Sequence, residues 1–319
     1  MTPFYRKNYF RIIVIPVAYA LFLRILFGLH NLSNLFSVMS FTFLFIGPVI
    51  MGILSTYFAK TEELKSKTAV FLIPWISLFV FFGTTFLLQL EGWACWMMIF
   101  PIFLIASSIG GYIGSKLNKD RKNKVQISII TLLPFLLAPL ENKITLTATT
   151  YNAYTSIEIN APAEKIWNQV TRVSEIEEHK DTGYLTRFLG FPRPLEAVLN
   201  YEGVGAYRKA IFTNGLVFHE TVTAYDHLQK MVFSIKANPY EIPSTTLDEH
   251  IAVGGKYFDV LNGTYELEKL GETRYKLHLY SNFIMNTKFN FYAGLWAKWI
   301  MKDIQNNILK IEKERAESN

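Results

Sequence analysis

Residues 157–167, IEINAPAEKIW, decide the fold of the second half of the chain. The first three of these residues complete a stretch of alternating apolar and polar residues, which predicts a strand over 155–159. A helix is expected next, with Asn160 as its cap, Pro162 in its first turn and Glu164 near its positive end. Its apolar stripe consists of Ile166, Trp167 and Val170. A second short helix is expected around 174–179.

The residues that follow predict a meander of strands closed by one long helix. After an irregular connection over 181–201, alternation predicts strands at 205–212, 216–225, 231–237, 257–267 and 274–283. Asn214-Gly215 predicts a tight hairpin. An amphipathic helix is expected over 287–315, with its apolar side formed by Phe291, Leu295, Trp299, Ile304 and Ile308. A sheet must bury one face, and this helix is the only large apolar cover, so an α+β domain is predicted over 145–319.

The first 144 residues are apolar enough to predict a bundle of about five membrane spans. The segments are 9–29, 38–58, 69–90, 94–115 and 125–140, each with one proline or more. The last has only 16 residues, and the second domain would change sides if it did not cross. Gly110, Gly111 and Gly114 predict a close contact between helices. No intramembrane run of Asp, Glu or His marks an ion pathway, which argues against a transporter.

The charges divide as a membrane topology requires. Of the net charge of +6, residues 1–144 carry 13 Lys and Arg against 5 Asp and Glu, and the remainder carries 19 against 21. Lys and Arg fill alternate loops and are absent from 30–37 and 91–93, which puts the amino terminus inside. Five crossings then place the second domain outside the cytoplasm, at the inner membrane of a bacterium. The same pattern argues against a nucleic-acid partner.

Two single residues of the first half invite comment. Arg24 and Glu91 fall on the same side of the predicted membrane and could pair, or Arg24 could instead reach the outer headgroups. Cys95 is the only cysteine, so an internal disulfide is excluded, and a buried thiol is expected.

Strand alternation predicts which side chains face the concave side of the sheet. Glu220 shares a face with Phe218, Val222 and Ala224, and parity in the next-to-last strand puts Asp259 inside with Leu261. Asp248, Glu249, His250 and Lys256 would form a polar pole beside them. The expected ligand-binding residues are Phe218, Glu220, Val222, Phe233, Asp259, Leu261, Leu279, Leu295 and Trp299.

Plainer interpretations stand beside these. Glu220 can form a structural ion pair with Arg208, and His250 can be a solvated or capping residue. His219 and Glu220 cannot converge on a metal, because adjacent strand residues point to opposite faces. Phe291, Trp296 and Trp299 are expected to be core or cavity wall rather than part of a cofactor site. Neither a phosphate loop nor a nucleophile elbow occurs, so we expect no metal and no cofactor.

The 157–167 stretch, the order of elements and the final helix resemble the START-like or SRPBCC superfamily over about residues 151–311. That group includes polyketide cyclases, lipid-transfer domains and the birch-pollen-allergen fold. The resemblance implies a helix-grip fold with an apolar ligand between a curved sheet and the long helix. Together with the apolar spans, the stretches 247–250, 254–261 and 289–296 resemble uncharacterised bacterial membrane proteins of this superfamily. No activity can be inferred from this resemblance.

Three functions follow as hypotheses. The first is a membrane-anchored protein that binds or transfers a lipid or other apolar molecule, with the bilayer as its other partner. The second is a cyclase or dehydratase with Glu220 or Asp259 as base and His250 as acid, which needs a carboxylate pKa raised by an apolar cavity. The third is a sensory or assembly module without catalysis, so the sequence does not establish an enzyme.

Overall fold

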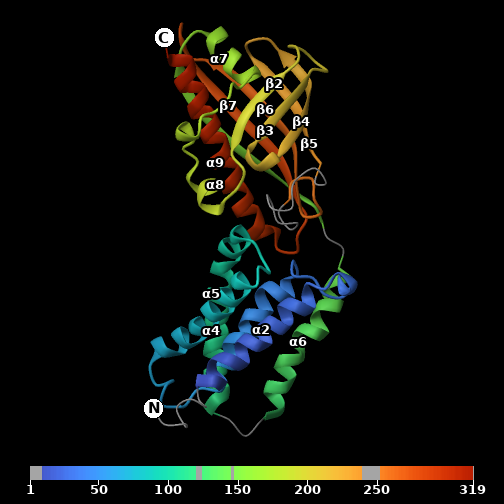
Figure 1. The fold of residues 1–319 in the computed structure, drawn as a ribbon, viewed down its shortest axis with the longest axis vertical. Coiled ribbons are helices and arrows are strands. Elements are labelled where there is room, and N and C mark those ends of the chain that lie inside the picture. Colours follow the sequence, from blue (N-terminus) through green and yellow to red (C-terminus); the bar gives the residue numbers. More distant parts are fainter. Residues whose placement is uncertain (1–8, 120–123, 145–146, 239–251, 319) are drawn as a thin grey trace. The chain divides into compact units, whose positions relative to one another are not determined.

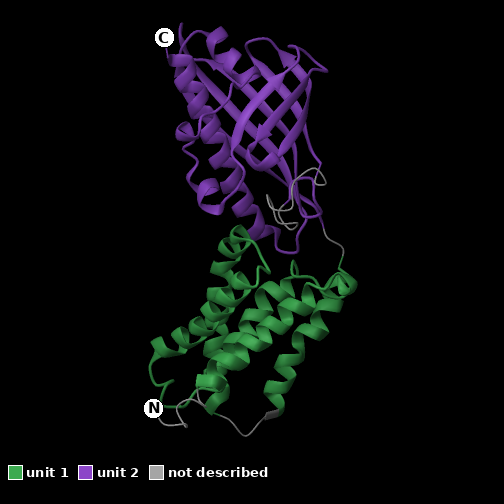
Figure 2. Cartoon of the chain, in the orientation of Figure 1, with its two compact units in different colours: residues 1–146 green, residues 147–319 purple. Residues whose placement is uncertain are grey.

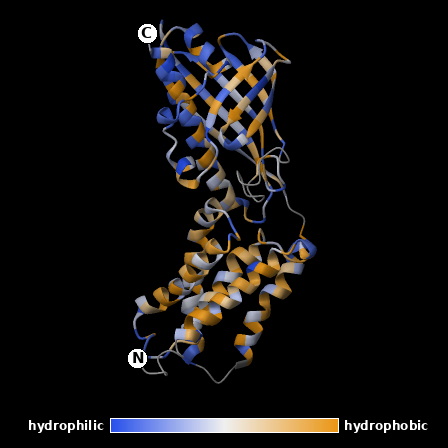
Figure 3. Cartoon of the chain, viewed as in Figure 1, coloured by the Kyte–Doolittle hydropathy of each residue, from blue (hydrophilic) through white to orange (hydrophobic). Residues whose placement is uncertain are grey.

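The computed structural model describes residues 9–119, 124–144, 147–238 and 252–318. The chain divides into two compact units, Met1–Leu146 (unit 1) and Thr147–Asn319 (unit 2). Unit 1 is built from helices and unit 2 from one sheet with a long helix (Figures 1 and 2). Hydrophobic residues dominate the helices of unit 1, whereas they alternate with polar residues in unit 2 (Figure 3).

Among its described residues, unit 1 contains four helices that are long and apolar enough to cross a membrane, and a shorter fifth. η1 (Phe10–Val14) runs into α2 (Ile15–Phe27), and η3 (Thr42–Ile46) runs into α3 (Gly47–Tyr57) after the short η2 (His30–Leu32). α4 (Lys67–Leu87), α5 (Trp93–Lys119) and α6 (Lys124–Asn142) follow. The second expected span is the short one, about 24 Å at 1.5 Å per residue, whereas the last is longer than expected.

α3 lies at the centre of the bundle, with nearly all of its residues buried. Its neighbour α5 approaches closely because its contact residues are glycines. A Cβ atom on Gly110 would overlap the carbonyl of Val49, and one on Gly114 would overlap Ile53. The predicted close contact is confirmed, and it explains how a short helix can be covered on every side.

The helices of unit 1 alternate in direction. At one end, the Asn118 amide of α5 donates to the carbonyls of Tyr57 and Ala59, both at 2.8 Å. At the other end, the Glu141 carboxylate of α6 accepts the backbone N–H groups of Phe41 (2.6 Å) and Thr42 (2.9 Å), where η3 begins. The connections 28–41 and 88–92 lie at this second end and contain no Lys or Arg.

Arg24 and Glu91 form an ion pair at that same end. Arg24 Nη2 lies 2.7 Å from Glu91 Oε1, and the two side chains are 11% and 7% exposed. Arg24 Nη2 also donates to the carbonyl of Leu90 at 2.5 Å. Pairing, rather than an extended Arg24 side chain, is therefore the arrangement found, and it fixes the end of α2 to the α4–α5 connection.

Unit 2 is a curled antiparallel sheet of seven strands in the order β1-β7-β6-β5-β4-β3-β2. The strands are β1 (Thr149–Asn160), β2 (Pro194–Leu199), β3 (Tyr207–Phe212), β4 (Val217–Asp226), β5 (Lys230–Ala237), β6 (Phe258–Lys269) and β7 (Arg274–Met285). β2 to β7 are neighbours in sequence order, and β1 pairs with β7. α9 (Asn290–Glu317) lies along the sheet, giving a helix-grip-like fold (Figure 1).

The segment between β1 and β2 differs most from expectation. α7 (Ala163–Thr171) forms with Ile166, Trp167 and Val170 buried, but no side chain caps it, and Asn160 instead donates its N–H to Glu317 Oε1 at 2.7 Å. Residues 174–177 are not helical, because Ile176 donates its N–H to the carbonyl of Leu195. Leu195 belongs to β2, a strand that the sequence did not predict. Only η4 (Glu178–Lys180) and α8 (Tyr184–Leu189) follow as helical turns.

Candidate functional site

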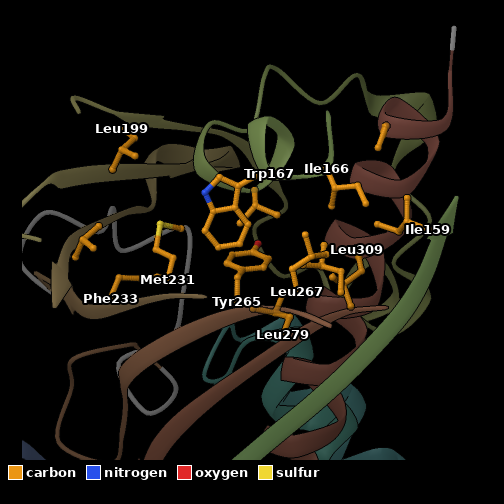
Figure 4. Close-up of a cluster of buried hydrophobic side chains, with 14 of the residues drawn as sticks. Ile159, Ile166, Trp167, Leu199, Met231, Phe233, Tyr265, Leu267, Leu279 and Leu309 are labelled. Carbon is orange, nitrogen blue, oxygen red and sulfur yellow. The ribbon is translucent and has the colours of Figure 1, made fainter. Parts of the chain in front are cut away.

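One end of the inner face of the sheet is a closed core (Figure 4). Trp167 of α7 lies over Tyr265 of β6, with Leu309 of α9 beside them and Met231 of β5 on the other side. These side chains are at most 2% exposed. The expected ligand-binding residues at this end, Val222, Phe233 and Leu279, belong to the same buried cluster.

The other end of the inner face is more open, and we call it the open end. Its core consists of Ala153, Leu216, Val253, Val260, Phe283 and Met285. Around this core lie apolar side chains that are only partly buried: Tyr151, Phe212, Phe218, Ile235, Ala237 and Phe258 from the sheet, Phe191 from the segment after α8, and Ala293, Ala297 and Met301 from α9. α9 thus contributes mostly small residues here, and the apolar surface opposite them is incompletely covered.

A buried ion pair lies between these two ends. Arg208 of β3 and Glu220 of β4 are directly opposite in register, and Arg208 Nη1 donates to Glu220 Oε2 at 2.5 Å. Both side chains are 5% exposed, and Arg208 also donates to the carbonyl of Thr171 at 3.4 Å. Burial raises the pKa of the Glu220 carboxyl, and the Arg208 charge opposes that rise. Glu220 is thus on the predicted inner face, and it forms the ion pair with Arg208 that the sequence analysis gave as an alternative.

Glu312 of α9 completes this polar cluster. It is 1% exposed, and the side chain that interacts with its carboxyl as a hydrogen-bond partner is Tyr265. Burial raises its pKa to about 8, although the neighbouring Tyr265 and the charges of Arg208 and Arg315 oppose the rise. The carboxyl is therefore mostly protonated at neutral pH, and it can donate or accept a proton inside an apolar core.

The other buried polar residues of α9 show how unusual Glu312 is. Gln305 donates to the carbonyl of Ala153 (3.2 Å) and to Ser281 Oγ (3.1 Å). Asn307 donates to Asp181 Oδ1 at 2.8 Å and accepts the N–H of Thr182. Polar groups inside a protein normally have such partners. Among the described residues, the Glu312 carboxyl has only the neighbouring Tyr265 side chain in that role, and burial still raises its pKa.

β-bulges explain two errors of strand parity. The register shifts between Val260 and Asn262, so Val260 pairs with the buried Phe283 and Asp259 pairs with Ile284, on the outer side. Asp259 instead accepts the N–H of Val260 at 2.9 Å, and Leu261 is the extra, half-buried residue of the bulge. A second shift at Val222 leaves Ala224 exposed and opposite Val232. Asp259 is therefore not an inward carboxylate.

Leu295 and Trp299 are not on the inner face either. They are 49% and 51% exposed, and Phe291 is 64% exposed, so the expected apolar side of α9 points away from the sheet. The buried positions of α9 are Gly294, Gln305, Asn307, Leu309, Ile311, Glu312 and Ala316. Several of these are polar or small, which is why the hydrophobic pattern selected the wrong face.

The remaining candidates separate clearly. Asp248, Glu249 and His250 lie outside the described residues, and Lys256 is exposed with its ammonium 5.3 Å from the centre of the Tyr257 ring. His219 is on the outer side, where its Nδ1 lies 2.6 Å from the Tyr207 hydroxyl. Within the described parts of the chain, no three His, Cys, Asp or Glu side chains are grouped as metal ligands.

The residue that sequence reasoning missed is Glu312. Gln305, Leu309, Glu312 and Ala316 are spaced as one helix face, with intervals of four, three and four residues. A polar residue on the same face as Leu309 was the available signal. It was overlooked because the aromatic residues of the preceding turns defined a different and stronger stripe.

Unit 1 has a groove of about 640 Å³ between α4 and α5. Apart from Ser108, its lining is apolar or aromatic: Phe71, Trp75, Pro101, Leu104, Ile105, Ile109 and Tyr112. Trp75 donates its ring N–H to Ser108 Oγ at 2.9 Å. A groove so poor in charged groups offers no site for chemistry.

Comparison with known proteins adds the following. No protein-family model matches the chain, and no curated protein matches it. It is similar to norcoclaurine synthase from Thalictrum flavum, with 15% identity over 53% of this chain and 97% of that chain and a TM-score of 0.31. A protein from Nitrosospira multiformis has 17% identity over 50% and 96% of the chains, with a TM-score of 0.28. Likenesses this weak carry no activity to this chain.

Proposed function

We propose that the chain is a membrane-anchored protein whose helix-grip unit holds a lipid or another apolar small molecule, as START-like domains do. The observation that carries the proposal is the open end. There, Phe218 and Phe258 of the sheet and Ala293 and Ala297 of α9 pack against the same small core, and Phe218 and Phe258 keep part of their apolar surface exposed. Partly exposed apolar surface, with polar groups at a fixed place beside it, is typical of sites for amphipathic ligands.

The anchor is supported by the helices of unit 1. Four are long and apolar enough to cross a bilayer, and together with the shorter η3–α3 helix they alternate in direction as successive crossings require. The end that carries the connections 28–41 and 88–92 lacks Lys and Arg there, which favours an orientation away from the cytoplasm. We therefore propose a multi-pass protein of a bacterial inner membrane, with unit 2 on the outer side.

A substitution that fills the open end tests the binding proposal. Ala297→Phe adds a ring to the α9 side of the open end, whereas Ala224→Phe adds the same ring on the exposed outer side of β4. The full chain would be purified in lipid nanodiscs, and its retained apolar molecules extracted and measured by mass spectrometry against empty nanodiscs. We expect a molecule retained by the wild type and by Ala224→Phe and lost from Ala297→Phe. Equal extracts from all samples would refute binding.

Topology has its own test. A reporter that is active only outside the cytoplasm would be fused after residue 319, with a matched fusion in the lysine-rich connection after Lys119. We expect activity from the first fusion and not from the second. The opposite result would place unit 2 in the cytoplasm.

A second candidate function rests on Glu312. A buried carboxyl with a pKa of about 8 can serve as a general acid, in a cyclase or dehydratase acting on the bound molecule. Extracts rich in apolar metabolites would be incubated with wild-type protein and with Glu312→Gln, and compared by mass spectrometry. A product formed only by the wild type supports catalysis, and identical spectra argue for binding alone.

A further inference from the structure

The first turns of α9 expose an apolar stripe. Phe291, Leu295 and Trp299 are 64%, 49% and 51% exposed and recur every four residues. They share one face over about 12 Å of helix. Trp296 extends the stripe sideways, with its ring centre 5.5 Å from that of Trp299.

α8 packs beside α9 and exposes two further aromatic side chains. The carboxylate of Asp303 accepts the N–H (2.9 Å) and the hydroxyl (2.7 Å) of Thr186, which holds α8 beside α9. On α8, Tyr184 is 81% exposed and Phe188 is 48% exposed. We call these five residues, three on α9 and two on α8, the aromatic surface. Exposed apolar groups gathered in this way mark an interaction site rather than ordinary surface.

The composition of the aromatic surface fits a lipid bilayer. Tyr and Trp favour the boundary between headgroups and acyl chains, because each has an apolar ring and a polar group. Lys298 and Lys302 follow one edge of the stripe and can meet anionic headgroups. Two turns beyond Trp299, the exposed face becomes polar with Asn306 and Lys310. The apolar part therefore has a definite end, as expected of a helix that enters an interface at a shallow depth.

The path of the chain brings this surface close to the membrane that the proposed function requires. Asn290, the first residue of α9, donates its side-chain N–H to the carbonyl of Thr147 (3.3 Å) and to Thr149 Oγ1 (3.0 Å). Thr147 is only five residues after Asn142, where the last apolar helix ends. Five residues span about 17 Å at most. The first turn of α9 is thus held against Thr147 and Thr149, five and seven residues along the chain from the end of α6.

We infer that the aromatic surface docks on the bilayer, with its side chains among the headgroups of lipids that include anionic ones. This inference rests on the membrane anchoring in the proposed function and deepens it. Ala293 and Ala297, which border the open end, lie on the same turns of α9 as the docked residues. Docking would hold the open end at the membrane surface, from which an apolar molecule can enter without crossing water.

Fluorescence quenching in the full chain tests the docking. Cys95→Ala removes the only native thiol, and Trp299→Cys or the control Asn306→Cys introduces a single new one for an NBD label. Both variants sit on the exposed face of α9, two turns apart. The protein would be placed in nanodiscs of phosphatidylcholine and phosphatidylglycerol with a phosphatidylcholine spin-labelled near the headgroup. We expect quenching at 299 at least ~2-fold stronger than at 306, since such helices enter about 5–10 Å.

Each other outcome has a definite meaning. Equal quenching at both positions overturns docking, and so does a blue-shifted label at 299 without quenching, because a second copy or other protein would then cover the stripe. If the chain stays in the nanodisc and retains its apolar molecule while 299 is not quenched, only the docking fails. If the chain does not stay with the nanodisc, the proposed anchoring itself fails.

Discussion

Replacing Glu312 by Gln should change how the stability of unit 2 depends on pH. The pKa of this carboxyl is about 8 in the folded chain, against an ordinary value of 4.5. Below pH 4.5 the carboxyl is protonated in both states and has no effect. Between pH 4.5 and 8 the unfolded chain releases the proton while the folded chain keeps it, so the free energy of unfolding falls as pH rises.

The size of the effect follows from the same two values. The free energy of unfolding falls by about 1.4 kcal/mol for each pH unit in this range, and therefore by about 5 kcal/mol between pH 4.5 and pH 8. A Gln at this position stays neutral and loses nothing. We expect Glu312→Gln to match the wild type at pH 4.5 and to exceed it by about 5 kcal/mol at pH 8 and above.

The assay is urea-induced unfolding of the full chain in detergent, read by hydrogen–deuterium exchange of peptides from β6 and α9. Glu314→Gln is the matched control, because Glu314 is exposed on the same helix. It should follow the wild type at every pH. A constant difference between Glu312→Gln and the wild type from pH 5 to 9 would show that the carboxyl titrates normally, and would refute both its buried proton and its role as an acid.

Two further predictions follow from buried contacts. Arg208→Met should cost about 3–5 kcal/mol in urea unfolding of unit 2 because Glu220 is left unpaired, whereas adding Glu220→Leu should recover most of that loss; an additive double variant would contradict the pairing. In thermal unfolding in detergent, Gly110→Ala should lower the melting temperature of unit 1, because its Cβ overlaps the Val49 carbonyl, whereas Gly83→Ala, with open space around it, should not lower it.

The sequence predicted the elements of unit 2 better than it predicted their faces. All six expected strands, the α7 helix and the final helix are present. β1 begins six residues earlier than expected, and the other strand ends shift by at most two residues. Assignments by parity held for Glu220 but not for Asp259, because a bulge at Val260 adds one residue. A bulge requires only a local break in pairing, so alternation along a single strand does not reveal it. Each such residue reverses every inward and outward assignment beyond it.

The face of α9 was missed for a different reason. A hydrophobic stripe on a helix predicts burial inside the domain only when the rest of that domain covers the stripe. The stripe at Phe291, Leu295 and Trp299 is exposed, while Gln305, Asn307 and Glu312 are buried. Gln305 and Asn307 are buried there because Ala153, Asp181 and Ser281 supply partners that are distant in sequence. Long-range partners of this kind cannot be read from the helix alone.

The corrected faces change which ligands the site suits. With Asp259 outside, the inner side of the open end is apolar, and Glu220 lies on β4 between Phe218 of the open end and Val222 of the closed core. A molecule held at the open end would therefore meet apolar surface along its length and a charged pair only where the core closes. Such a gradient favours an amphipathic molecule with its polar group innermost. If the turns of α9 that carry Ala293 and Ala297 are held at the bilayer, the apolar part of the bound molecule lies nearest the lipid.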